Sequence, residues 1–272
     1  MDITGNAFVT GGGSGIGKAC CIAMAQEGAR GLLVADIDLK AAQKTVAEAV
    51  IAASNPSFRG EAIEIDVSDE ESVKRAVAHM AESFGRIDYC VHSAGIPPRT
   101  DYSMGEARFA ELKDLLGVHV HGTFLVTNLV TAAMKSQELR PVDATSPQLG
   151  GIRGAIVTMG SVASLFAPPG MVQYSSSKYA VLAITRTVAI ENAAHGIRAN
   201  CLCPTWVDTP LMRQTMEATP GDTVRTLVDG KIPMNRIGYP KEIADSAIFL
   251  CSPRSSFITG IALPIDGGMT LM

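Results

Sequence analysis

The segment NAFVTGGGSGIG, residues 6–17, decides the fold class of this chain. A short apolar run, 6–11, leads into a glycine-rich turn, and the residues after the turn have the apolar spacing of a helix. Within 16–27 that spacing places on one helical face Ile16, Ala19, Cys20, Ala23 and Met24. A strand, a glycine-rich turn and a helix in this order predict the start of an alternating strand–helix fold.

The same alternation continues along the whole chain. Further apolar runs predict strands at 31–37, 61–67, 87–95, 154–161, 197–204 and 260–268. Helical spacing recurs between them at 38–53, 69–84, 107–135, 173–194 and 240–251. Short buried strands separated by helices are typical of right-handed βαβ units in one parallel sheet. The sequence therefore predicts an α/β fold over 1–272, a single-domain, Rossmann-type, doubly wound parallel sheet of about seven strands with helices on both faces.

Two long segments interrupt this pattern. Residues 136–153 are polar and rich in proline and glycine, and we expect them to form a surface insertion. Residues 205–239 are a long, irregular stretch that carries Met212, Met216 and Met234 and follows the end of a strand. Loops of this length inside a compact domain are usually functional lids or disordered. We expect 205–239 to be a substrate lid.

The composition is that of an ordinary globular protein, with 272 residues of which 47% are hydrophobic and 18% charged. A net charge of −4 gives no indication of a nucleic-acid or anionic-membrane partner. The first ten residues lack a basic leader pattern, and no apolar stretch approaches a membrane span, so a cytoplasmic location is expected. The six cysteines form no CxxC pair, which favours reduced thiols that pack as small hydrophobic side chains.

Asp36 gives the glycine-rich turn a more specific meaning. Glycines allow the backbone to approach a pyrophosphate, and a helix N-terminus supplies free N–H groups. Asp36 closes the second strand about nineteen residues after Gly17, where an acid accepts hydrogen bonds from both ribose hydroxyls of an adenosine. The same carboxylate repels a 2′-phosphate, and neither Ser14 nor Ile37 offers a cation. NAD(H) is therefore favoured over NADP(H), and the alternative interpretation of Asp36 is a solvated loop acid.

The stretch YSSSK, residues 174–178, places Tyr174 and Lys178 on one face of a helix. A phenol has a pKa of about 10, and a nearby ammonium together with an oxidised nicotinamide would lower that pKa. Ser161 ends the preceding strand, from which its hydroxyl could hydrogen-bond a substrate oxygen. Each feature alone has a plain structural interpretation, as a surface pair or a helix cap. Their occurrence together, in this order, predicts a catalytic site.

With these motifs the chain resembles the short-chain dehydrogenase/reductase superfamily from about Phe8 to Gly268. The stretch PTWVDT, 204–209, resembles the family's PGxxxT segment. The combination of SPQLGGIRGAIVTMGS, 146–161, and CPTWVDTP, 203–210, is similar to fungal members that act on secondary metabolites. The resemblance implies a catalytic Ser161, Tyr174 and Lys178. It also implies a cofactor site formed by Gly11, Gly13, Ser14, Gly15, Ile16, Gly17, Asp36, Ile37, Asp66, Val67, Ser93, Ala94, Gly95, Tyr174, Lys178, Pro204, Val207 and Thr209.

Three positions depart from the family's pattern. HSAG, 92–95, replaces NNAG, and the hydroxyl of Ser93 offers fewer donors than asparagine. Thr205 replaces a glycine, so that turn must suit a β-branched residue. His119 occupies the place of an asparagine that holds a water in the family's proton relay. Because histidine titrates near neutral pH, we hypothesise that His119 is a catalytic relay residue. The alternative is that it fills the asparagine position by packing alone.

The pair His119 and His121 does not predict a metal site. Side chains two residues apart on a helix point about 200° away from each other, so one ion cannot join them. His92 lies at a strand end, but no cysteine or acidic cluster with ligand spacing accompanies it. We therefore predict no metal, and we expect His121 to face another helix or a neighbouring subunit.

These observations predict an NAD-dependent short-chain alcohol dehydrogenase or ketoreductase with Tyr174 as its acid/base group. Phe166, Trp206 and Met212 would join Ser161 and Tyr174 in binding a bulky lipophilic small molecule, although apolar side chains also suit a core or a subunit contact. The alternatives are an NADPH-dependent or non-redox enzyme of the same fold, such as a dehydratase, epimerase or cyclase, and a nucleotide-bound scaffold without turnover. The resemblance also implies a homodimer or homotetramer built on the helices of 107–135 and 173–194.

Overall fold

The computed structural model describes residues 3–98, 103–143, 145–218 and 224–272. Its main sheet has seven parallel strands in the order β3-β2-β1-β4-β7-β8-β9, which confirms the predicted fold class. The chain winds outward from β1 in one direction and then returns to continue from β4 in the other. The strands are β1 (Asn6–Thr10), β2 (Gly31–Asp36), β3 (Arg59–Glu64), β4 (Tyr89–His92), β7 (Gly154–Met159), β8 (Ile197–Pro204) and β9 (Ala262–Ile265).

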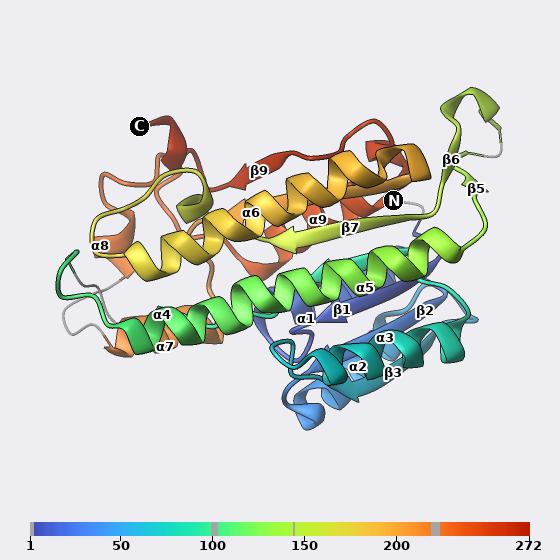
Figure 1. The fold of residues 1–272 in the computed structure, drawn as a ribbon, viewed down its shortest axis with the longest axis horizontal. Coiled ribbons are helices and arrows are strands. Elements are labelled where there is room, and N and C mark those ends of the chain that lie inside the picture. The colour runs from blue at the N-terminus through green and yellow to red at the C-terminus, as the bar shows by residue number, and fades with distance from the viewer. Residues whose placement is uncertain (1–2, 99–102, 144, 219–223) are drawn as a thin grey trace.

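Helices cover both faces of the sheet (Figure 1). Within β1, Val9 faces one hydrophobic core and Phe8 faces the other, as the two-residue period of a strand requires. One face carries α1 (Gly15–Gln26), α2 (Leu39–Ala52) and α9 (Pro240–Cys251). The opposite face carries α3 (Glu70–Phe84), α5 (Gly122–Ser136) and α6 (Val172–Asn192).

The predicted helix over 107–135 is not one regular helix. It consists of α4 (Phe109–Leu115), a π-helical turn (Leu116–His121) and α5. The run Phe109–Lys135 has the length and composition of a membrane-crossing helix, so the expectation that no apolar stretch approaches a span is wrong. Its apolar side chains belong instead to a face that packs on the sheet, and 44% of its most apolar stretch is buried in the fold.

The two long segments both contain secondary structure. The insertion 136–153 lies at the surface and includes a small hairpin of β5 (Arg140–Pro141) and β6 (Gly151–Ile152), while residue 144 is outside the described residues. The segment 205–239 is less irregular than predicted, because it contains α7 (Pro210–Ala218) and α8 (Val224–Val228). Residues 219–223 of this segment also lie outside the described residues. A separate hydrophobic cluster holds the two helices, formed by Met212, Leu227, Val228, Ile232 and Ile237.

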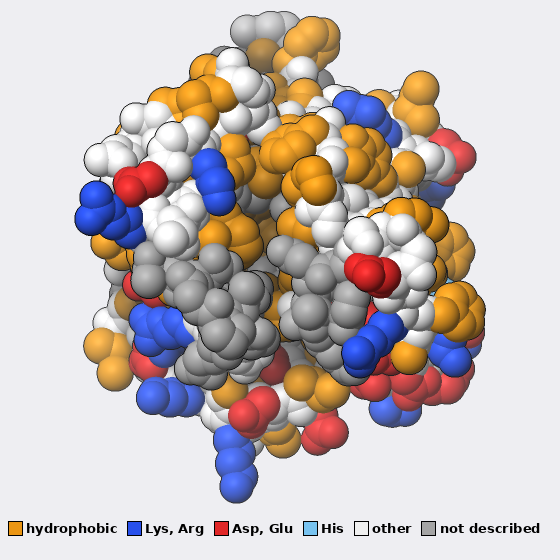
Figure 2. Space-filling view, turned by 90° about the vertical axis from the view of Figure 1, so that its left-hand side faces the viewer, with side chains coloured by type: hydrophobic (Ala, Val, Ile, Leu, Met, Phe, Trp, Pro, Cys, Tyr) orange, Lys and Arg blue, Asp and Glu red, His pale blue; other side chains and the backbone are white. Residues whose placement is uncertain are grey.

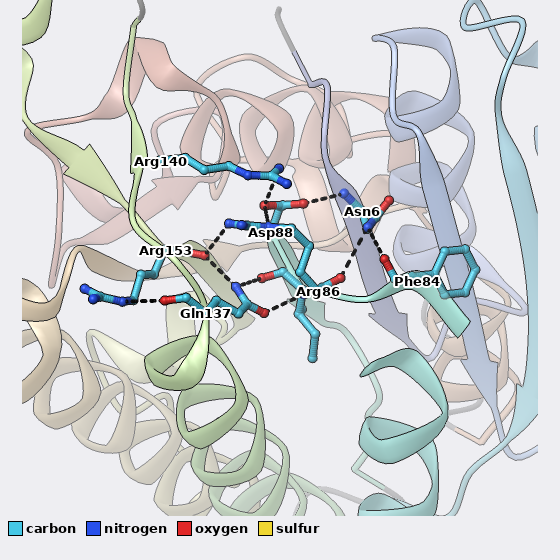
Figure 3. Close-up of polar contacts among 8 residues, drawn as sticks. Asn6, Phe84, Arg86, Asp88, Gln137, Arg140 and Arg153 are labelled. Atoms are coloured by element: carbon cyan, nitrogen blue, oxygen red, sulfur yellow. Dashed lines mark hydrogen bonds and ion pairs between the residues drawn. The ribbon is translucent and has the colours of Figure 1, made fainter. Parts of the chain in front are cut away.

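A polar network fastens the insertion to the sheet at the amino ends of β1 and β4 (Figure 3). Asp88 accepts the backbone N–H of Asn6 at 2.8 Å and pairs with Arg86 and, at 3.6 Å, with Arg140 of the hairpin. The side-chain amide of Gln137 donates to the carbonyl oxygen of Arg153 at 3.0 Å. This network lies at the opposite end of the strands from the site described below.

Candidate active site

A cavity of about 830 Å³ opens at the carboxyl ends of the strands. Figure 2 looks onto this end of the molecule, where hydrophobic side chains gather around the central hollow. The cavity is lined by residues at the ends of β1, β2, β3, β4, β7 and β8, together with parts of α6 and α7. All the predicted catalytic, cofactor-binding and substrate-binding residues line it except Gly13 and Gly17.

The glycine-rich turn brings backbone close to the cavity. Gly11 (φ +66°) packs so tightly that a Cβ there would lie 2.7 Å from the backbone nitrogen of Ala94. Helix α1 begins at Gly15 (φ +52°), its N-cap Ser14 makes no side-chain capping bond, and its first turn has no acidic residue. The start of α1 therefore presents uncapped N–H groups and a positive helix end to the cavity, an arrangement that fits a pyrophosphate.

Gly13 and Gly17 shape the glycine-rich turn and do not themselves line the cavity. The N–H of Gly13 donates to Oδ2 of Asp36 at 2.8 Å, and a Cβ on Gly13 would lie 2.8 Å from that same oxygen. A Cβ on Gly17 would lie 2.1 Å from the carbonyl oxygen of Gly11. Both positions need glycine because the chain passes itself closely at these points.

The end of the cavity beside β2 carries two oriented carboxylates. Asp36 is held through its second oxygen by the N–H of Asp38 at 3.0 Å. Asp66, after β3, accepts the N–H and the hydroxyl of Ser68 at 2.9 Å and 2.6 Å. Among the described lining residues the lysines are Lys178 and Lys231, and neither comes from the glycine-rich turn, β2 or the segment after β3.

Ser161, Tyr174 and Lys178 form one wall of the cavity, as predicted. The ammonium of Lys178 donates to the carbonyl oxygen of Met159 at 2.9 Å and lies 5.6 Å from the centre of the Tyr174 ring. A residue that the sequence analysis missed, Ser164, accepts the N–H of Ser161 at 3.1 Å and donates to the carbonyl of Lys178 at 2.9 Å. The sequence signal that could have indicated Ser164 is its position three residues after Ser161, which is the spacing of a capping box.

Burial is the largest influence on the pKa values of Tyr174 and Lys178. It raises the pKa of Tyr174 to about 12, although a hydrogen bond with Ser161 acts in the other direction. It lowers the pKa of Lys178 to about 8. In the protein without its cofactor, desolvation of the phenolate therefore determines the direction of the pKa change at Tyr174. The lowering expected from Lys178 together with an oxidised nicotinamide concerns the cofactor-bound protein and stays a prediction.

His119 is present in the wall, but it does not titrate near neutral pH as predicted. Burial, followed by the charge of Lys178, lowers its pKa well below the ordinary 6.5. The same causes lower the pKa of His92, whose Nδ1 lies 2.7 Å from the hydroxyl oxygen of Thr10, to about 3. His121 is exposed while His119 is buried, so the two rings diverge. Among the described residues, no group of three histidines, cysteines or acids could hold a metal ion.

The other end of the cavity is apolar. Phe166 and Trp206 line it, and Met212 lines it while also packing into the cluster of α7 and α8. Prolines and further methionines also line the cavity, namely Pro168, Pro169, Met171, Met269 and Met272. The predicted substrate residues therefore line one end of the cavity, and Met212 also belongs to a hydrophobic core cluster.

Comparison with known proteins decides the family. Residues 11–270 match the family described as enoyl-(acyl carrier protein) reductase. The chain is also 48% identical over 271 residues to the short-chain dehydrogenase fogB of Aspergillus ruber, covering 100% of this chain and 98% of that protein. The chain belongs to the short-chain dehydrogenase/reductase family. The predicted likeness to fungal members is thereby confirmed.

Solved structures of short-chain dehydrogenases and reductases share the whole fold. Levodione reductase is 28% identical with a TM-score of 0.86, covering 100% of this chain and 99% of that one. A 3-ketoacyl-(acyl-carrier-protein) reductase from Brucella melitensis, solved as a complex with NADH, is 29% identical with a TM-score of 0.82, covering 98% of each chain. Membership of this family makes the protein an oxidoreductase that uses a nicotinamide cofactor and acts on small molecules.

The structure explains how this short-chain dehydrogenase/reductase accommodates Thr205. The N–H of Thr205 donates to the carbonyl of Ile265 at 3.3 Å, and its backbone needs no left-handed conformation. Its hydroxyl lies 3.0 Å from the sulfur of Met269, in the C-terminal turn that lines the cavity. Thr205 thus connects the end of β8 to one wall of the apolar end.

Proposed function

We propose that this chain is an NAD(H)-dependent alcohol dehydrogenase or ketoreductase that acts on a bulky, lipophilic secondary alcohol or ketone. The observation that carries the cofactor preference is the carboxylate of Asp36. Backbone N–H groups of Gly13 and Asp38 hold it at the end of β2, on a wall to which the described part of the chain contributes no lysine or arginine. A fixed anion at this point accepts ribose hydroxyls and repels a 2′-phosphate.

The reacting groups suit hydride transfer to and from a carbonyl carbon. A nicotinamide bound in the cavity would supply or accept the hydride. The Ser161 hydroxyl accepts an N–H from Ala163 at 3.1 Å and hydrogen-bonds Tyr174, so its proton can turn from the phenol to a substrate oxygen bound beside it. Tyr174 stays protonated in the free protein, which equips it to donate a proton during ketone reduction. Alcohol oxidation needs additional positive charge near the phenol, such as an oxidised nicotinamide carries.

The apolar end supports the proposed substrate class. Phe166, Trp206 and Met212 offer hydrophobic surface and carry no charged group. A lipophilic ring system therefore gains more binding free energy against these side chains than a charged metabolite would. The thioethers of the surrounding methionines adapt their shape to a bulky ligand.

Cofactor titrations test the first part of the proposal. The fluorescence of bound NADH and NADPH gives both dissociation constants, and we expect NADH to bind at least about tenfold more tightly. Asp36→Ala should bring the dissociation constants of NADH and NADPH closer together. Comparable affinity of the unaltered protein for NADPH would contradict the role of Asp36.

A substrate panel tests the second part. Cyclic and polycyclic secondary alcohols are assayed with NAD⁺, and the corresponding ketones with NADH. Tyr174→Phe should bind NADH and fail to turn it over. Nicotinamide binding without oxidation or reduction of any panel member would favour a non-redox enzyme or a scaffold.

We also propose that the chain forms a homo-oligomer through α4, α5 and α6. Large apolar side chains are exposed on these helices, with Phe109 72%, Phe124 55% and Ile190 81% exposed. Apolar surface of this kind favours association. Light scattering after gel filtration measures the mass, and a monomer at micromolar concentration would contradict this part of the proposal.

A further inference from the structure

The imidazole of His119 has a hydrogen-bond partner on each ring nitrogen. Its Nε2 lies 3.1 Å from the backbone nitrogen of Ile96, which can only donate, so Nε2 accepts. A neutral imidazole then carries its proton on Nδ1, which lies 2.9 Å from the hydroxyl oxygen of Ser177. Ser177 in turn donates to the carbonyl oxygen of Tyr174 at 2.7 Å. The three bonds run from the loop after β4 to the first turn of α6.

The surroundings of this ring oppose a positive charge on it. His119 is 1% exposed. The titratable groups that act on it, Lys178 from α6 and His92 from β4, add to the effect of burial and lower its pKa. A second proton would have to enter at Nε2 and would break the bond from Ile96. His119 is therefore neutral near neutral pH, with its proton on Nδ1.

We propose that His119 is a positioning residue that couples the loop 93–96 to the turn of α6 that carries Tyr174, and that it takes no proton during the reaction. The inference rests on the proposed function for the chemistry of Tyr174, but not for the coupling itself. The His119 ring meets the Tyr174 ring edge to face, with centroids 5.7 Å apart and planes at 80°. A Cβ on Gly95 would lie 3.2 Å from Nε2 of His119, so the loop backbone packs directly on the ring.

The π-helical turn explains why the ring reaches both segments. Such a turn contains more residues than an α-helical turn and recurs at functional sites. His119 lies buried in this turn with its ring between the loop after β4 and α6, while His121 is exposed. Because its donor and its acceptor are fixed on one rigid ring, His119 holds Ile96 and Ser177 at a set separation. Tyr174 and the cavity-lining residues Ser93, Ala94 and Gly95 then keep one relative position.

Nitrogen NMR of the ¹⁵N-histidine-labelled protein tests the protonation without any turnover. His119→Gln identifies the His119 signals by removing them. We expect a protonated Nδ1 and a bare Nε2 that do not titrate between about pH 6 and 9. A proton on Nε2, or a titration in that range, would overturn the proposal. Because this readout needs no substrate, it stands even if the proposed oxidoreductase activity is not found.

Kinetics of Ser177→Ala test the coupling. This change removes the hydrogen bonds that connect His119 through Ser177 to the carbonyl of Tyr174, and it keeps the hydrogen bond between His119 and Ile96. We expect kcat to fall about tenfold with an unchanged pH profile and an NADH dissociation constant within about threefold of that of the unaltered protein. Ser176→Ala, an exposed neighbour on the same helix, is the matched control and should leave kcat unchanged.

The double variant separates coupling from general damage. If His119 and Ser177 act as one unit, His119→Gln combined with Ser177→Ala should lower kcat no further than the worse single change. Additive losses, an unaffected kcat in Ser177→Ala, or a shifted pH profile in His119→Gln would each overturn the proposal. The last of these results would restore a relay role for His119.

Discussion

The hydroxyl of Ser164 donates a hydrogen bond to the backbone carbonyl of Lys178 at 2.9 Å. It also accepts the N–H of Ser161 at 3.1 Å, so a single buried side chain joins the end of β7 to α6. Two residues of the catalytic wall that lie far apart in the sequence therefore keep their relative position through a third one. This arrangement fixes the hydroxyl of Ser161 opposite the Tyr174 turn.

Ser164→Ala should lower both stability and activity. It leaves the buried N–H of Ser161 without its partner and removes the second hydrogen bond on the Lys178 carbonyl, which costs about 1–3 kcal/mol of unfolding free energy. The loop that holds Ser161 is also released, so we expect kcat to fall about tenfold. Urea unfolding and steady-state kinetics measure the two effects. Thr187→Ala removes an exposed hydroxyl that donates to the carbonyl of Ala183 on the outer side of α6, and it should change neither quantity.

Gly13→Ala should weaken NADH binding while the fold persists. The added methyl group would lie 2.8 Å from Oδ2 of Asp36 and 2.8 Å from Cβ of Ala41, so the carboxylate must move from the position in which the Gly13 N–H holds it. We expect the dissociation constant of NADH to rise about tenfold, measured by nucleotide fluorescence. Gly117→Ala is the matched control, since its Cβ would meet nothing within 4 Å. Equal affinities of the two variants would argue that Asp36 does not contact the cofactor.

The sequence was sufficient for the sheet, for the Asp36 end of the cavity and for the wall of Ser161, Tyr174 and Lys178. These features depend on local patterns, namely apolar periods, a glycine-rich turn and an i,i+4 pair. The π-helical turn could not be predicted, because six residues are too few to distinguish its period from that of an α-helix. The partner of His119 was also hidden, since Ser177 is 58 residues away.

The titration behaviour was not predictable either. An isolated histidine or lysine suggests its ordinary pKa, whereas burial and neighbouring charges set the actual one. The positions of His119 and Lys178 in the sequence do not reveal that both lie in a desolvated wall. The helices α7 and α8 were missed for a related reason, because their apolar side chains serve a small separate cluster rather than the main core.

Asp88→Asn should destabilise the protein without changing catalysis. Asp88 is 8% exposed and bonds the Asn6 N–H while pairing with Arg86 and Arg140, at the end of the sheet away from the cavity (Figure 3). Removing the charge leaves two guanidinium groups without their carboxylate, and we expect a loss of about 2 kcal/mol in urea unfolding. Asp245→Asn removes an exposed partner of Lys241 and should cost less than about 0.5 kcal/mol. Similar losses for both variants would show that the network does not fasten the insertion.

Lys178→Met should stabilise the protein near neutral pH while abolishing activity. The pKa of Lys178 is about 8 in the folded protein, against an ordinary value of 10.5. Between these pH values the unfolded chain binds more protons, so the free energy of unfolding rises with pH. Below about pH 8 the lysine is charged in both states, and the full cost of burying it is present. Replacing it with methionine removes that cost but also loses the hydrogen bond to Met159.

We therefore expect Lys178→Met to gain about 1–2 kcal/mol at pH 7, and the gain to shrink as the pH approaches 10. Urea unfolding of both proteins across this pH range measures the difference. Lys40→Met, at an exposed lysine, should show no such trend. A variant that is less stable at every pH would mean that Lys178 is held by interactions stronger than its desolvation. In that case its place in the wall would reflect structural support as well as chemistry.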